Sequence, residues 1–93
     1  LLLVLDLSTA HLEGDYETLR HEINSFKEGL FDRERIVVLN KMDKVSREEA
    51  KQWEVFLAQK GETVAAVSAL EGWGIEELKT LIKEKGLDKV INA

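Results

Sequence analysis

The sequence predicts an α/β fold in which three parallel strands alternate with three helices. Three short apolar runs lack the alternation of polar and apolar residues that marks a half-exposed strand. Such runs are typical of parallel strands that are buried on both faces. A helical pattern follows each run, so the predicted order is βαβαβα in one unit of an open sheet. The three runs are Leu1–Leu5, Ile36–Leu39 and Val64–Val67.

The first predicted helix follows the strand Leu1–Leu5. Its apolar residues recur at steps of three and four, which places them on one stripe of a helix. They are Tyr16, Leu19, Ile23, Phe26 and Leu30.

The second predicted helix follows the strand Ile36–Leu39 and has clear signals at both ends. Ser46 and Glu49 form an S-x-x-E capping box, which marks the start of a helix. Gly61 is placed to end it. The apolar face between these ends carries Ala50, Trp53 and Leu57, so Trp53 is expected in the core.

The third predicted helix carries Ile75, Leu78, Leu81 and Ile82 and stops at Gly86. Right-handed crossovers place the first two helices on one face of the sheet, provided the strands lie in chain order. The third helix must then cover the other face, because strands this apolar cannot leave one face in water. No element is assigned to the Leu87–Ala93 tail.

Composition limits the functions that the chain can have. Its 93 residues carry 13 Lys plus Arg against 18 Asp plus Glu, a net charge of -5, which argues against a nucleic-acid or anionic-membrane surface. The chain has no cysteine, which excludes a disulfide framework and a thiolate metal site. Its longest apolar run, Leu1–Leu5, is far too short to span a membrane. We expect a soluble domain that begins inside a longer protein, since the chain starts without Met.

Ligands of open α/β sheets bind outside the carboxyl ends of the strands. The loops to examine are therefore 6–14, 40–45 and 68–74. The first of these begins with Asp6, which is expected to cap or turn the chain. The other two loops suit one planar ligand. Asn40, Lys41 and Asp43 follow the second strand, and Ser68, Ala69 and Leu70 follow the third.

A guanine edge presents two neighbouring donors, a ring N–H and an amino group, beside a keto oxygen. The carboxylate of Asp43 can accept from both donors, and the backbone N–H of Ala69 can donate to the keto oxygen. Ser68 can hold Asp43 in place, and the stem of Lys41 can lie over the ring. Asn40 can either bond the other base edge or tie the two loops together. Adenine offers one donor fewer, so guanine should bind tens- to thousands-fold better, given ~1.5–3 kcal/mol for a charge-assisted bond.

These residues also carry a family resemblance. Asn40-Lys41-Met42-Asp43 matches the N-K-x-D motif of P-loop GTPases, and Ser68-Ala69-Leu70 resembles their S-A-[KL] motif. Flanking segments, among them Leu3–Ser8, Asp15–Glu22 and Arg35–Leu39, look like the Obg family of ribosome-associated GTPases. The resemblance covers about residues 1–83. The chain departs from the family at Glu34, where a proline is common, and at Trp73, where a polar residue is common.

The resemblance implies that residues 1–93 are a single partial domain, the C-terminal half of a Ras-like, three-layer G domain with three parallel strands. It implies GTP or GDP as ligand, cytoplasmic location, and, for the parent protein, ribosome assembly with the large ribosomal subunit as partner. It assigns guanine binding to Asn40, Lys41, Asp43, Ser68, Ala69 and Leu70.

Hydrolysis is not expected from this chain alone. It has no G-x-x-x-x-G-K-[ST] loop to hold phosphates and no D-x-x-G turn near a γ-phosphate. We therefore assign it no catalytic residue and no metal ligand, and expect Mg²⁺ only in the parent protein. Without phosphate contacts, GDP or GTP should bind weakly, near or above the millimolar level that corresponds to ~4 kcal/mol.

Two alternatives remain open. The chain could be the first part of a circularly permuted ribosome-assembly GTPase, in which N-K-x-D precedes the phosphate loop. It could also be a structural half-sheet that self-associates without binding nucleotide. In that case the first strand, Leu1–Leu5, forms a bare apolar edge, and we expect a homodimer joined through this edge.

Overall fold

The computed structural model describes residues 2–25, 35–85 and 90–92. Its centre is a four-stranded sheet in the order β3-β2-β1-β4, with every neighbouring pair parallel. The strands are β1 (Leu2–Asp6), β2 (Ile36–Asn40), β3 (Val64–Ala66) and β4 (Val90–Asn92). The predicted α/β class and the chain-order arrangement of the first three strands are confirmed.

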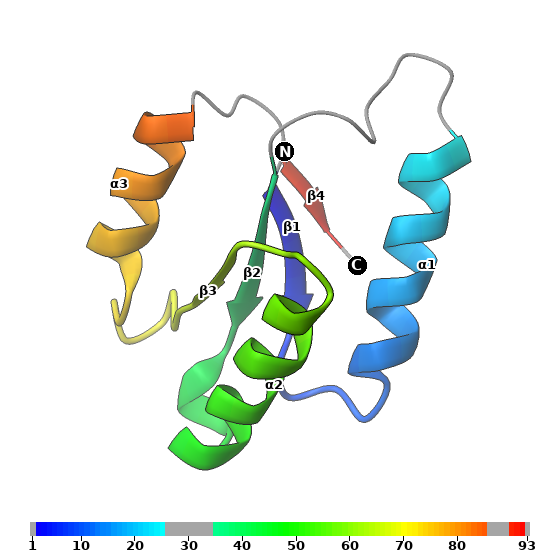
Figure 1. The fold of residues 1–93 in the computed structure, drawn as a ribbon. Helices are drawn as coiled ribbons and strands as arrows, with labels where there is room; N and C mark the ends of the chain where they lie inside the picture. The colour runs from blue at the N-terminus through cyan, green and yellow to red at the C-terminus, as the bar shows by residue number, and fades with distance from the viewer. Residues whose placement is uncertain (1, 26–34, 86–89, 93) are drawn as a thin grey trace.

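Three helices cover the two faces of this sheet, as predicted (Figure 1). They are α1 (Leu12–Ser25), α2 (Arg47–Gln59) and α3 (Ile75–Lys85), and a short 3-10 turn, η2 (Met42–Lys44), precedes α2. Buried residues of α1 and α2 pack against the face of β1 and β2 that carries Leu3, Leu5, Val37 and Leu39. The apolar side of α3 packs against the opposite face, at Ile36 and Val38.

The second helix forms where its capping residues predict. The Ser46 hydroxyl accepts a hydrogen bond from the Glu49 backbone N–H at 3.0 Å, which satisfies one of the free N–H groups of the first turn. Gly61, just beyond the helix, has φ +89°, a backbone conformation that favours glycine. Trp53, expected in the core, is only half-buried and packs against the edge of the core.

Two features of the fold differ from the sequence prediction or fall outside the described residues. The tail that received no element contains β4, which pairs with Leu2–Val4 of β1. The sheet therefore has four strands rather than three. The predicted helical residues Phe26 and Leu30, and the predicted stop at Gly86, lie outside the described residues.

The predicted bare edge at Leu1–Leu5 is wrong for the part that the structure describes. β1 lies between β2 and β4, and Leu2, Leu3 and Val4 face Val90, Ile91 and Asn92 in register. This part of β1 is thus an interior strand, so the edge that motivated the homodimer is already occupied. The reason is local: a three-residue strand from the tail is enough to pair with the amino-terminal half of β1.

A buried polar cluster joins several elements at the amino-terminal ends of the strands. The Glu62 carboxylate accepts from the Tyr16 hydroxyl at 2.5 Å and from two nitrogens of Arg35 at 2.9 and 2.6 Å. Burial, with the hydrogen bond to Glu62, raises the pKa of Tyr16, so its hydroxyl stays a donor. The cluster joins α1 to the segments that enter β2 and β3, and thereby fixes these elements relative to one another.

Candidate functional site

The predicted site loops meet at the carboxyl edge of the sheet, because β1, β2 and β3 are parallel neighbours. Asp6 and Asn40, the last residues of β1 and β2, stand opposite each other in register. The N–H of Leu7 donates to the Asn40 carbonyl at 2.9 Å, and the N–H of Met42 donates to the Val67 carbonyl at 3.0 Å. These backbone bonds hold the starts of all three loops side by side.

Asn40 connects the second loop to the third. Its side-chain Oδ1 accepts from the Lys41 backbone N–H at 2.8 Å and from the Ala69 backbone N–H at 3.1 Å. Of the two roles open to Asn40, the structure thus shows the one in which it ties the loops together. The Ala69 N–H, predicted to serve the keto oxygen of guanine, is engaged by Asn40 in this arrangement.

Asp43 is held from the third loop, as predicted. The hydroxyl of Ser68, a fully buried residue, donates to Asp43 Oδ1 at 2.7 Å. The same hydroxyl oxygen accepts from the Glu71 N–H at 3.1 Å. This second bond orients the Ser68 hydroxyl so that its own proton points at the Asp43 carboxylate. Asp43 Oδ2 lies 3.9 Å from the Lys44 ammonium. The side chain of Asp43 is only 11% exposed, so the carboxylate is presented in one orientation.

Lys41 has a backbone conformation that is uncommon for its residue type. Its φ of 67° and ψ of 35° lie in the left-handed region, which costs about 1 kcal/mol or more for a residue with a Cβ. Its ammonium group donates to Asp6 Oδ2 at 2.9 Å. The turn at Lys41 thus directs the side chain back across the end of β1.

Asp6 is the residue at this edge that the sequence prediction left out of the site. Its Oδ1 accepts from the Ser8 backbone N–H at 2.8 Å and from the Ser8 hydroxyl at 2.6 Å, while its other oxygen accepts from Lys41. The Ser8 hydroxyl and then Lys41 lower the pKa of Asp6 to about 2. Asp6 does turn the chain, as predicted, and in addition it holds Lys41. No local signal in the sequence indicates the contact with Lys41, because it depends on the register of β1 and β2.

The loop 68–74 is closed by backbone hydrogen bonds. The Ser68 N–H donates to the Trp73 carbonyl at 3.0 Å, and the N–H groups of Gly72 and Trp73 donate back to the Ser68 carbonyl at 2.8 and 3.1 Å. Leu70, at the tip, is 78% exposed. Gly74 has φ +72°, and a Cβ there would lie 2.6 Å from the Ala66 carbonyl oxygen. This glycine therefore allows α3 to start directly against β3.

An open cavity of about 530 Å³ borders Asp43 between this loop and α2. Trp73, which is half-exposed, forms one wall, and Met42, Val45 and Ala66 contribute apolar surface. The carboxylate of Asp43 thus lies beside an open space that is bordered by this apolar surface and by the charged side chains of Arg47, Lys51 and Glu54 of α2.

Neither a metal centre nor a membrane span is found in the described part of the chain. Within residues 2–25, 35–85 and 90–92, no three His, Asp or Glu residues are grouped so that they could hold a metal ion. No helix within these residues is both long enough and apolar enough to cross a membrane.

Comparisons with known proteins point to one group of GTPases. No protein-family model matches the sequence. The GTPase Obg of Chloroherpeton thalassium is 34% identical over 82 residues, which cover 88% of this chain and 24% of the relative. The GTPase Obg of Acaryochloris marina is 30% identical over 90 residues, which cover 96% and 25%. The chain therefore spans about a quarter of the length of these curated relatives.

A solved structure extends the likeness to the fold. Translation elongation factor SelB of Methanococcus maripaludis, determined in complex with the GTP analogue GppNHp, superposes with a TM-score of 0.64 and 25% sequence identity. The superposition covers 97% of this chain and 21% of that protein.

Proposed function

Because this chain is an Obg-like segment of a GTPase domain, we propose that its loops 40–45 and 68–74 recognise the guanine base of GTP or GDP. In this proposal Asp43 accepts from the two guanine donors, and Ser68 keeps Asp43 oriented. Lys41 covers the base with its aliphatic stem. Ala69 and Leu70 form the rim of the third loop.

The observation that carries the proposal is the link between the two loops. Asn40 Oδ1 accepts from Ala69 N–H, and Ser68 Oγ donates to Asp43 Oδ1, so each loop is held by a side chain of the other. A pair of turns that only reverse the chain does not need these two cross-links. A site that must present a carboxylate at a fixed distance from a backbone donor does need them.

The keto oxygen of guanine requires a donor beside Asp43. The Ala69 N–H can serve it as a bifurcated donor shared with Asn40, or after the Asn40 amide turns away. Turning the amide would also direct its NH₂ group towards the other edge of the base. We therefore propose that Asn40 links the loops and can also contact the base, the two roles that its position allows.

We also propose a role for the parent protein on the basis of the Obg relationship. Its guanine site would be completed by phosphate-binding and Mg²⁺-binding segments that residues 1–93 do not contain. Such a protein would hydrolyse GTP and act in ribosome assembly at the large subunit, in the cytoplasm. This chain by itself would bind nucleotide weakly and would not hydrolyse it.

A nuclear magnetic resonance titration of the 93-residue chain tests base recognition. We expect GDP to shift the amide signals of Asp43 and Ala69 with millimolar affinity, and ADP to bind at least about tenfold more weakly because adenine has neither the ring N–H nor the neighbouring amino group that Asp43 would accept from. Equal shifts with ADP would overturn the proposal.

A substitution makes the same test sharper. Asp43→Asn replaces one acceptor by an NH₂ donor, so it should lose affinity for GDP and gain affinity for XDP, whose xanthine base has a keto oxygen in place of the amino group. We expect the GDP/XDP preference to change by at least about tenfold. Glu84→Gln, at the far end of α3, removes the same charge and should leave the preference unchanged. A preference that stays the same in Asp43→Asn would contradict the assignment of Asp43.

A further inference from the structure

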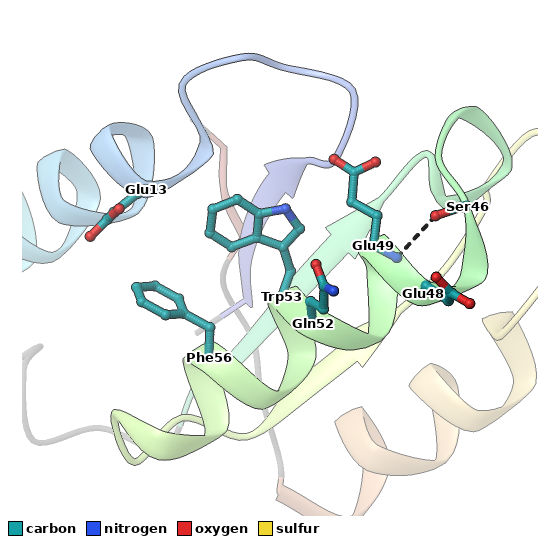
Figure 2. A pocket seen from close by; sticks show the side chains of 7 residues that line it. All are labelled: Glu13, Ser46, Glu48, Glu49, Gln52, Trp53 and Phe56. Atoms are coloured by element: carbon teal, nitrogen blue, oxygen red, sulfur yellow. Dashed lines mark hydrogen bonds between the residues drawn. The ribbon is translucent and has the colours of Figure 1, made fainter.

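A second cleft lies apart from the guanine loops, between α2 and the start of α1. It has a volume of about 630 Å³, and two half-buried aromatic side chains of α2, Trp53 and Phe56, line it. Their rings meet edge to face, with centroids 5.5 Å apart and planes at 88°. Figure 2 shows both rings pointing from α2 towards the side on which α1 lies. The pair forms an aromatic corner that is open to solvent.

The charged side chains that line this cleft are all acidic. Glu13 of α1 and Glu48 and Glu49 of α2 line the cleft, and no lysine or arginine is among its seven lining residues. In Figure 2 the Glu49 side chain extends on the same side of α2 as the Trp53 ring, and Glu13 is supplied from the facing helix. The cleft thus combines aromatic faces with carboxylates, which together attract a cation.

The same helix already shows this attraction at one ring. The Lys60 ammonium lies 5.0 Å from the centroid of Phe56 and 3.7 Å from Glu17 Oε1. A cation is therefore held between an aromatic ring of α2 and a carboxylate of α1. The corner between Trp53 and Phe56 offers the same two kinds of group on the same two helices.

We propose that the cleft lined by Trp53, Phe56 and Glu13 binds an arginine side chain from a basic segment of a partner protein. The occupant is argued from charge complementarity: the lining carries three carboxylates, and the whole chain carries a net charge of -5. Arginine fits better than lysine because its planar guanidinium can stack on an indole and still donate in a fork to a carboxylate. The surface is separate from the guanine loops, so the inference does not depend on the proposed function.

The dipole of α2 does not oppose the binding of a cation at the two rings. The positive end of a helix dipole acts mainly within the first turn. Glu48 and Glu49 lie in that turn and offset it, while Trp53 and Phe56 lie in the second and third turns. A guanidinium above the two rings therefore lies beyond the positive end of the helix dipole, and the positive charge near Phe56, the Lys60 ammonium, is paired with Glu17.

The test is a titration of the full 93-residue chain with a synthetic peptide that alternates glycine and arginine. The peptide should shift the indole N–H signal of Trp53 and the amide signal of Phe56. A matched peptide with citrulline in place of arginine keeps the shape of the side chain and removes its charge, and should bind at least about tenfold more weakly. A lysine peptide should bind, but more weakly than the arginine peptide.

Charge variants separate this cleft from general attraction to an acidic protein. The double variant Glu13→Gln, Glu49→Gln should weaken binding of the arginine peptide about threefold to tenfold. The double variant Glu76→Gln, Glu77→Gln on α3 changes the net charge equally and should leave binding within about twofold. Trp53→Leu keeps apolar volume but removes the indole, and should weaken binding while circular dichroism shows an intact fold.

Three results would overturn the proposal. The first is equal binding of the citrulline peptide, and the second is an equal loss of affinity in the α3 control variant. The third is a set of shifts centred on the guanine loops instead of Trp53 and Phe56.

Discussion

At the residue scale, the contact between Asp6 and Lys41 shows how one carboxylate links two loops. Asp6 uses one oxygen for Ser8 and the other for Lys41. This leaves Lys41 in a left-handed turn with its ammonium group held at the end of β1. The contact is about half exposed, so its effect on global stability is modest, but it determines where the Lys41 stem lies.

Acid should weaken this contact in a defined pH window. The pKa of Asp6 falls from 3.8 to about 2 on folding, so its stabilising contribution is complete above about pH 4 and is lost as the pH falls towards 2. The difference in unfolding free energy between the unaltered chain and Asp6→Asn should therefore shrink as the pH falls from 5 to 2. Because Asp6 is exposed, we expect less than about 1 kcal/mol at pH 5.

Urea unfolding at several pH values measures this difference. Glu84→Gln removes one carboxylate far from the site and controls for net charge. An Asp6→Asn difference that is constant between pH 5 and pH 2 would show that the Asp6 carboxylate does not make this contribution.

At the element scale, the conformation of the loop 68–74 depends on how closely α3 follows β3. The helix begins at Ile75, directly after the loop, and the chain turns into it with a backbone at positive φ. Gly72 and Gly74 both provide it, with φ +77° and +72°. They differ in their surroundings: the space at Gly72 is open, whereas Gly74 lies against the backbone of β3.

These two glycines form a matched pair for mutation. Gly72→Ala should cost about 1 kcal/mol, because only the unfavourable φ is added. Gly74→Ala adds a Cβ that would meet the Ala66 carbonyl oxygen at 2.6 Å, so it should cost about 3 kcal/mol or more and move α3 away from β3. Chemical unfolding of both variants gives the comparison. Equal costs would contradict the close approach of Gly74 to β3.

At the scale of the whole molecule, the two ends of the sheet carry different kinds of polar contact. The amino-terminal end carries the buried cluster of Tyr16, Arg35 and Glu62, which fixes the elements. The carboxyl end carries exposed loops that are cross-linked by Asn40 and Ser68. The buried cluster joins the segments that enter β2 and β3, and the two hydrogen bonds at the other end hold the loops and their polar groups together.

The pairing of β4 with β1 gives a prediction for the whole chain. A chain that ends at Lys85 lacks β4 and exposes the edge of β1, an apolar strand, to pairing with another molecule. We expect this shortened chain to have a higher average mass by light scattering than the full chain at the same concentration. A control chain with an equally long Gly-Ser tail after Lys85 should behave like the shortened one. If both stay at the mass of the full chain, β4 does not protect this edge.

The amino-acid sequence determined the alternation of strands and helices, the faces that α1, α2 and α3 cover, and the cap at Ser46. These features depend on local periodicity and on hydrogen bonds between near neighbours, and both can be read along the chain. It also determined which residues gather at the carboxyl edge, because parallel strands end on the same side.

Only the tertiary structure decided what pairs with β1, what Lys41 contacts and how Asn40 uses its oxygen. β4 has three residues, too few for a periodic pattern, and it forms because β1 offers it a partner. Asp6 and Lys41 are 35 positions apart, and Asn40 and Ala69 are 29 apart. Such contacts depend on strand register, which places distant residues opposite each other and leaves no local signal in the sequence.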